Sequence, residues 1–425
     1  MGSRMTSPAG TGLVWDERYL WHHPGGGAGP LAHGASLIEP GDFGEEGPQP
    51  RRRLRNLIEV SGLAGQLQCL APRLASDAEL LRVHSPGYVE RIAALSAQGG
   101  GDAGGGTPFG ANGNMVARLA VGGCLQAVEL VTDGSLRNAY ALVKPPGHHA
   151  AAGTGAGHCI FNNVAAAAAH ARAACGAGRV TIVDWDVHCG DGTQAIFYSE
   201  PDVQVISLHQ ADWYPRGKGA ATDAGAGAGL GAHINVPLPP GSGKGAYRDA
   251  FERVVLPAVQ SHAPDLILIS CGFDAGANDP SGRMLLTSED FRFMTRWVMQ
   301  AADELCDGKL VVCHEGGYSA TYVPFCGVAV LEELCGAVAT VCDPFLERYA
   351  GVGYEQLQAH QASAVDYAIV QHQALGADWA VAQTASPWPA PPMFAPATGV
   401  GRPAALPPRK PLSSDGLEGL PGGTP

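Results

Sequence analysis

Residues 180–192 read VTIVDWDVHCGDG. The first half is a β-branched apolar run, typical of a buried parallel strand, and the second half is polar and ends in a Gly-Asp-Gly turn. Alternate side chains of an extended chain point the same way, so Asp184, Asp186 and His188 share one side. Two carboxylates and an imidazole at a strand end suit a divalent metal such as zinc. The alternative is an ordinary polar loop that closes the strand.

Four more apolar segments end in polar residues in the same way. These segments are Ala139–Val143 before His148 and His149, Val203–Leu208 before His209, Leu266–Ser270 before Asp274, and Leu310–Cys313 before His314 and Tyr318. Helical spacing separates them at Asn163–Ala174, Ala246–Ser261 and Ser288–Cys306. Strands alternating with helices predict an α/β fold with a mainly parallel sheet. Ligands of such sheets bind outside the carboxyl ends of the strands, so we expect an active site there.

The N-terminal third of the chain carries further elements. We expect a strand at Leu13–Asp16, a loop over residues 25–50, and a glycine-rich loop at Gly99–Gly106, which lacks the spacing of a phosphate-binding loop. Helices are predicted at Arg51–Ser61, Asp77–Val83, from Tyr88 to Ala97, and Asn114–Val131. Residues 375–425 are rich in Pro, Ala and Gly, and we expect a disordered tail because they cannot bury enough apolar surface.

Composition narrows the function classes. The chain has 425 residues, 45% of them hydrophobic, which suffices for a full core. Its net charge of −13 argues against nucleic acid as a partner. No run of 18 apolar residues and no apolar N-terminal segment occur, so we expect no membrane span and no signal peptide. Eleven cysteines without a CxxC pair indicate reduced thiols in the cytoplasm.

Five motifs occur in order along the chain. They are PPGHH at 145–149, HCIFNN at 158–163, DWDVH at 184–188, GFD at 272–274 and EGGY at 315–318. Together they resemble the class II histone deacetylase family, nearest to the bacterial histone-deacetylase-like amidohydrolases. The resemblance covers about Leu13 to Ala374 and implies a catalytic domain in residues 1–374 with the three-layer α/β/α arginase/deacetylase fold. It also implies a zinc-dependent amide hydrolase that acts on acetylated amines.

The resemblance assigns roles to individual residues. The zinc ligands would be Asp186, His188 and Asp274, which leave a coordination position open for water. His149 would act as general acid and base, with His148 acting mainly electrostatically. Asp184 and Asp191 would orient His148 and His149 respectively. Tyr318 would stabilise the oxyanion.

Two further sets of residues follow from the resemblance. A structural potassium ion would be held by Asp184, Asp186, His188, Ser207 and Leu208, mostly through carbonyl oxygens. The substrate would contact Asp102, His158 and Tyr214. Asp102 matches an aspartate that grips the substrate backbone, although a solvated loop acid is the alternative.

Two positions depart from the family pattern. Cys189 stands where relatives carry a second histidine, and it is either an inert buried cysteine or a thiol available to the metal. His158 stands where relatives carry Phe or Tyr as a wall of the acyl-lysine tunnel, so substrate preference is expected to differ. Position 281 is Ser281, whereas polyamine-specific relatives carry a glutamate there, which weakens a dedicated acetylpolyamine role.

We therefore predict a zinc-dependent deacetylase of N-acetyl-lysine or similar acylated amines. One alternative is an acetylpolyamine or other small-amide amidohydrolase. Another is a catalytically weak deacetylase fold that acts as a binding module. A ureohydrolase of the arginase type is less favoured because no DxHxD cluster supplies a second set of metal carboxylates. Association into a homo-oligomer stays open.

Overall fold

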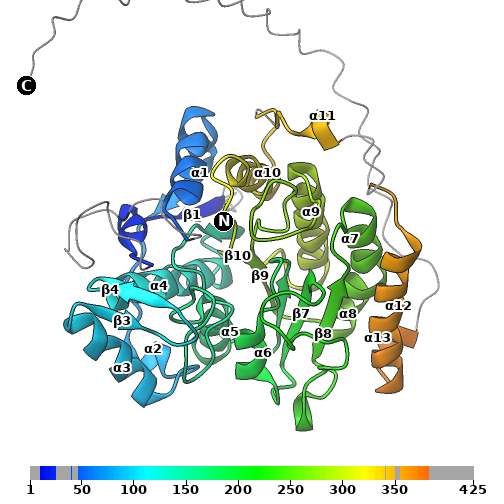
Figure 1. Ribbon diagram of the computed structural model, residues 1–425, viewed down its shortest axis with the longest axis horizontal. Helices are drawn as coiled ribbons and strands as arrows, with labels where there is room; N and C mark the ends of the chain where they lie inside the picture. The colour runs from blue at the N-terminus through cyan, green and yellow to red at the C-terminus, as the bar shows by residue number, and fades with distance from the viewer. Residues whose placement is uncertain (1–9, 25–39, 41–45, 340, 350–354, 382–425) are drawn as a thin grey trace, which may run out of the picture. The chain divides into compact units, whose positions relative to one another are not determined.

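A computed structural model of the chain has an eight-stranded sheet at its centre (Figure 1). The structure describes residues 10–24, 40, 46–339, 341–349 and 355–381, which belong to one unit within Met1–Pro387. The strand order is β2-β1-β5-β10-β9-β6-β7-β8, and every neighbouring pair is parallel. The strands are β1 (Thr11–Val14), β2 (Leu67–Leu70), β5 (Asn138–Ala141), β6 (Val180–Asp184), β7 (Val203–Gln210), β8 (His233–Leu238), β9 (Leu266–Cys271) and β10 (Leu310–His314). The predicted parallel α/β fold is confirmed.

Helices connect the strands, as parallel pairing requires. Those that match predicted helices are α1 (Gln49–Val60), α2 (Asp77–Leu80), α3 (Pro86–Ala97), α4 (Gly113–Thr132), α5 (Asn163–Ala174), α7 (Lys244–Ala250), α8 (Leu256–His262) and α9 (Ser288–Leu305). A π-helical turn at Phe251–Val255 joins α7 to α8, so the single helix predicted over Ala246–Ser261 is divided. Helices without a sequence prediction are α6 (Asp191–Phe197), α10 (Val323–Cys335), α11 (Leu346–Tyr349), α12 (Ala359–Ala374) and α13 (Asp378–Val381).

The core lies on both faces of the sheet. On one face, alternate strand residues such as Leu268 and Val311 pack with α4 and α5 in one apolar cluster. The intervening residues, such as Ile269 and Val312, point to the other face and are equally buried. There α9 and α10 pack against each other and against β9 and β5, and α1 packs on α10. This is the three-layer arrangement that the family resemblance implies.

Helix α4 is long and apolar enough to pass a membrane-span test by length and composition. It is instead a core helix, since 67% of its most apolar window is buried inside the fold. Buried residues occur on every side of it, which explains an apolar stretch that is wider than one stripe.

Two sequence expectations need correction. The segment Gly99–Gly106 contains a short strand, β3 (Gly100–Asp102), paired antiparallel with β4 (Pro108–Gly110). Its glycines form the turn, where Gly104, Gly105 and Gly106 all have positive φ. The predicted tail begins too early at 375, because α13 continues the fold and Trp379 is 6% exposed beside His372. The rest of that tail, residues 382–425, and much of the predicted loop at 25–50 lie outside the described residues.

Candidate active site

The three predicted metal ligands converge at the carboxyl edge of the sheet. Asp186 and His188 follow β6, and Asp274 follows the adjacent strand β9. One ligand atom from each residue lies within 4.8 Å of the others. His188 is 8% exposed and both carboxylates are fully buried.

Asp186 accepts backbone hydrogen bonds on both carboxylate oxygens, with Oδ1 bonded to His188 N at 2.9 Å, whereas Asp274 uses only Oδ1 for the backbone. Asp186 Oδ2 accepts a hydrogen bond from Gly316 N at 2.9 Å, and Asp274 Oδ1 accepts one from Val187 N at 2.8 Å. Asp274 Oδ2 is buried 3.1 Å from His188 Nδ1 but accepts no hydrogen bond from any described residue. Burial, followed by the nearby charge of Asp186, raises the pKa of Asp274 to about 7. A divalent cation would offset both effects, so this donor set fits a metal.

Glycines let the backbone approach this centre. A Cβ atom on Gly272 would collide with the carboxylate of Asp186, and one on Gly316 would collide with that of Asp274. Contacts this close exclude any side chain at these two positions.

The tandem histidines lie beside the predicted ligands, each held by a carboxylate. His148 Nδ1 is 3.0 Å from Asp184 Oδ2, and His149 Nδ1 is 2.8 Å from Asp191 Oδ1. Burial and the positive charge of His148 lower the pKa of His149 to about 4. For His148, burial is outweighed by the carboxylates of Asp186 and Asp184, and its pKa is raised well above the ordinary value.

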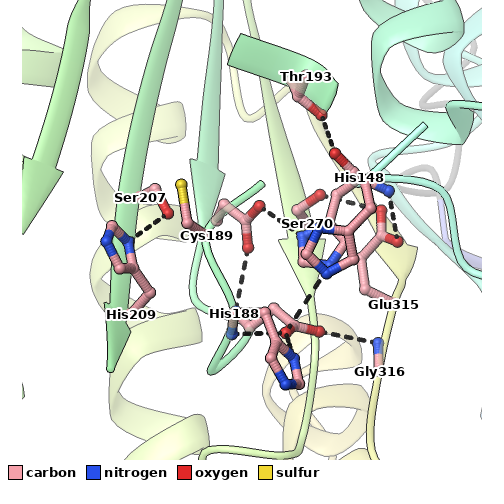
Figure 2. A network of polar contacts seen from close by, with 12 residues as sticks. His148, His188, Cys189, Thr193, Ser207, His209, Ser270, Glu315 and Gly316 are labelled. Atoms are coloured by element: carbon pink, nitrogen blue, oxygen red, sulfur yellow. Dashed lines mark hydrogen bonds and ion pairs between the residues drawn. The ribbon is translucent and has the colours of Figure 1, made fainter. Parts of the chain in front are cut away.

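Glu315 is a residue of this site to which the sequence reasoning gave no role. Its Oε2 accepts hydrogen bonds from Gly147 N at 2.6 Å and His148 N at 3.1 Å, and its Oε1 accepts one from Ser270 Oγ at 3.0 Å (Figure 2). The carboxylate therefore fixes the loop that carries both histidines. Its place at the end of β10, beside the other polar strand ends, was the available signal.

A pocket of about 430 Å³ opens above the centre. At its base lie His149, His188 and Tyr318, and its walls include Gly157, His158, Trp213 and Tyr214. A Cβ atom on Gly157 would collide with the ring of His149, so this wall needs a glycine. The remaining lining residues, near the surface, are Gly105, Gly106, Pro280, Ser281 and Arg283.

Asp279 is a second functional candidate to which the sequence reasoning gave no role. Its Oδ2 accepts hydrogen bonds from the backbone N–H groups of Tyr318 at 2.7 Å and Ser319 at 2.9 Å, and its Oδ1 accepts one from Ser281 N at 3.0 Å. Burial raises its pKa to about 6. One carboxylate thus ties the loop of Tyr318 to the loop of the pocket rim.

Two of the three predicted substrate contacts line the pocket, and the third does not. His158 and Tyr214 line the pocket, and the His158 ring centroid lies 6.1 Å from that of Tyr318. His158 has a φ of 68°, a left-handed conformation that histidine adopts more readily than most residues. Asp102 is not among the lining residues, and its Oδ1 accepts hydrogen bonds from Gly104 N at 2.6 Å and Thr107 N at 3.2 Å within the β3–β4 turn. Its substrate role stays a prediction.

The thiol of Cys189 points away from the predicted metal ligands. Figure 2 shows its sulfur on the side of Ser207 and His209, with the His188 ring on the other side. The sulfur is 3.8 Å from Asn235 Oδ1, and burial raises the pKa of the thiol well above its usual value. This arrangement is that of an inert buried cysteine.

The residues predicted to hold potassium come from the end of β6, the loop after it, and the neighbouring part of β7. Asp184 is the register partner of Ser207 in the β6–β7 pair, and Ser207 and Leu208 are fully buried. Ser207 Oγ is 2.9 Å from His209 Nδ1. The potassium site stays a prediction.

Comparisons with known proteins identify the family of the chain. The histone deacetylase domain model matches residues 46–334. The chain belongs to the histone deacetylase domain family. It is 45% identical over 335 residues to a histone deacetylase-like amidohydrolase of Pseudomonas aeruginosa, covering 79% of this chain and 88% of that protein.

More distant relatives also match. A polyamine deacetylase HDAC10 of Mus musculus is 38% identical over 280 residues, which cover 61% of this chain and 40% of that protein. The crystal structure of the HDA15 HD domain superposes with a TM-score of 0.76 at 32% identity, covering 88% of this chain and 97% of that domain. The chain therefore has the arginase/deacetylase fold of the class II relatives, and its family is one of metal-dependent deacetylases.

Proposed function

We propose that the protein is a zinc-dependent deacetylase that removes acetyl groups from N-acetyl-lysine or similar acylated amines. The observation that carries this proposal is the pocket itself, whose base brings the ligand His188 together with His149 and Tyr318. A general base, a hydrogen-bond donor and an open metal site then face the same small volume.

Asp186, His188 and Asp274 would hold the zinc ion. Two carboxylates and one imidazole match the three-ligand open sites of zinc hydrolases. Bound there, zinc would lower the pKa of a water molecule toward ~7 and polarise the substrate carbonyl. The Gly316 and Val187 N–H groups keep the ligand oxygens aimed inward.

The protons are handled by this chain's own side chains. Asp191 accepts the Nδ1–H of His149, which leaves Nε2 unprotonated and able to take a proton from the attacking water. His149 then returns this proton to the leaving amine. His148 does not line the pocket and is held by Asp184. It therefore acts electrostatically, from outside the pocket, and does not transfer a proton to the substrate.

Tyr318 supplies the donor for the developing oxyanion. Its surroundings raise the pKa of the phenol well above 10, chiefly through burial, so the hydroxyl keeps its proton. A neutral hydroxyl at the pocket base can donate to the carbonyl oxygen as it becomes negative.

Zinc content and turnover measured together test the proposal. Purified protein is expected to contain close to one zinc per chain and to hydrolyse acetyl-lysine peptides. Asp186→Ala should lose zinc and activity together, because the centre loses one of three ligands. Full zinc occupancy in Asp186→Ala would contradict the ligand assignment.

The acetylpolyamine alternative has less support. A distal ammonium needs a nearby carboxylate, but the pocket rim has Ser281 and Arg283 in that region. Rates on an acetyl-lysine peptide and on an acetylated diamine compare the two substrates directly. The third possibility, a silent binding module, predicts zinc without turnover.

Two further assignments belong to this proposal. We place a structural potassium ion at Asp184, Asp186, His188, Ser207 and Leu208, supported by the pairing of Asp184 with Ser207 in adjacent strands. We also assign the protein to the cytoplasm, supported by eleven free cysteines, most of them buried, with no disulfide.

A further inference from the structure

The rim of the pocket carries a positive charge. Among the described residues that line the pocket, Arg283 is the only Lys or Arg, and none of them is an Asp or Glu. The exposure of the lining residues increases from the base of the pocket to its rim. His149 and His188 at the base are buried, whereas the rim residues are exposed: Tyr214, Pro280 and Arg283. The acyl group reacts at the base, so the rest of the amine lies at the rim.

Arg283 is held in place rather than free in solvent. Its guanidinium carbon lies 5.5 Å from the centroid of the Trp213 ring, within range of a cation–π contact. Nη1 donates to the carbonyl oxygens of Pro280 at 2.9 Å and Gly282 at 2.6 Å. The Trp213 ring is fixed in turn, because its Nε1 donates to Ser281 O at 2.8 Å.

These contacts leave part of the guanidinium available. No described residue forms a hydrogen bond or ion pair with Nε or Nη2 of Arg283. Two N–H donors on one edge of a guanidinium match the two oxygens of a carboxylate. A preorganised arginine also loses less side-chain entropy on binding than a mobile lysine does.

The net charge of −13 does not cancel this local effect. At physiological ionic strength charges are screened over ~8 Å, so a group at the rim responds mainly to Arg283. Asp102 does not line the pocket, and its Oδ1 accepts hydrogen bonds from the β3–β4 turn.

We propose that Arg283 makes the pocket rim an anion subsite, so that the enzyme prefers acylated amines whose amine part carries a carboxylate. This inference rests on the proposed deacetylase function. The carboxylate has two possible sources: an acidic residue next to the acyl-lysine of a peptide, or the α-carboxylate of a free acyl amino acid. Substrates with an ammonium at this distance are disfavoured by the same charge.

Matched substrate pairs test the inference on the zinc-loaded full chain. The first pairs are acetyl-lysine peptides that differ only by Asp or Asn before or after the acetyl-lysine. The second pair is free Nε-acetyl-lysine and its α-amide. The carboxylate member is expected to have a kcat/KM about two- to fivefold higher, the range of an exposed ion pair, and the ratio should fall toward one as salt rises.

Variants identify the residue responsible. Arg283→Gln should bring the ratio to about one, Arg283→Lys should retain part of the preference, and Arg283→Glu should invert it. Arg216→Gln is the matched control, because Arg216 is also exposed and follows Tyr214 but does not line the pocket. It should leave the ratio unchanged.

The outcomes separate the two proposals. Hydrolysis of the Asn peptide with no preference for either carboxylate source would overturn the anion subsite and leave the deacetylase function intact. A preference that survives in Arg283→Gln would also overturn it. No turnover of any acetylated peptide or amide would overturn the function itself, and the inference with it.

Discussion

Asp279 offers a sharp test of how the site is positioned, since its carboxylate joins two loops without lining the pocket. Asp279→Asn keeps the size of the side chain but leaves one acceptor oxygen. That oxygen can serve either Ser281 or the pair Tyr318 and Ser319, and the pair offers two bonds. We therefore expect Asp279→Asn to lose the Ser281 bond, whereas Asp279→Ala loses all three.

The expected sizes follow from these bonds. A hydrogen bond to a charged group contributes about 1.5–3 kcal/mol, so Asp279→Asn should lower the free energy of unfolding by roughly that amount. Asp279→Ala should cost about 3–6 kcal/mol, because water that enters recovers part of the three bonds. A hydrogen-bond donor to the oxyanion raises kcat by about 10²–10³-fold. Without Asp279 the loop of Tyr318 is no longer fixed and its hydroxyl is displaced, which loses part of this factor, so we expect Asp279→Ala to lower kcat by about 10–100-fold.

A double-mutant cycle with Tyr318→Phe separates positioning from general destabilisation. If Asp279 acts through the tyrosine hydroxyl, Asp279→Ala should lower kcat by less than about threefold once that hydroxyl is absent. Asp290→Asn is the matched control: Asp290 is also a buried carboxylate with a pKa of about 6, and it accepts two hydrogen bonds from Thr287 at the start of α9. It should lower stability and leave kcat unchanged. An undiminished effect of Asp279→Ala in the Tyr318→Phe background would refute the reasoning.

Three further predictions concern single side chains. Tyr318→Phe should lower kcat by about 10²–10³-fold with unchanged zinc content, and a loss below about tenfold would show that the hydroxyl is not the main oxyanion donor. His158→Phe should raise kcat/KM on acetyl-lysine peptides by roughly three- to thirtyfold through apolar contact with the substrate methylenes, and a slower variant would indicate a polar contact between His158 and the true substrate. His84 is buried, donates to Ala151 O and accepts from Asn162 N, and burial lowers its pKa to about 4. Because its pKa is lowered in the folded state, the stability that neutral His84 contributes is complete above about pH 6.5 and is lost as pH falls toward 4. Between pH 7 and pH 5 the free energy of unfolding, measured with denaturant, should therefore fall by about 2 kcal/mol less in His84→Gln than in wild type. An equal fall in both proteins would contradict the burial argument.

Much of the fold was predictable because a parallel sheet shows clearly in sequence. Strands buried on both faces, such as β6 and β9, are continuous apolar runs, and their polar ends must meet at one edge. The edge strand β2 is only four residues long with a largely exposed pattern, so it lacks that signal. Helix α12 was missed because its apolar residues do not form one clear stripe, although it packs on the edge strand β8.

The residues of the site also differ in how far the sequence could predict them. For residues inside motifs, such as Asp186 and His149, the position at one edge of the sheet could be predicted, because their spacing along the chain reflects their place after strand ends. Asp279 could not, because its role depends on hydrogen bonds to residues 39 and 40 positions away in sequence. The role of Arg283 could not be predicted either, because its guanidinium is held against the ring of Trp213, which lies 70 positions earlier in the sequence.

The glycines packed against the carboxylates of the predicted metal site limit how this enzyme can evolve. Gly272 and Gly316 have no room for even a methyl group, so a substitution at either position would displace the carboxylate of Asp186 or Asp274, two of the predicted metal ligands. Arg283, in contrast, is exposed at the pocket rim, where side chains of other sizes and charges have space outward to solvent. Mutation can therefore change which molecules enter the pocket while the chemistry at its base stays the same, and new substrate ranges should arise at the rim.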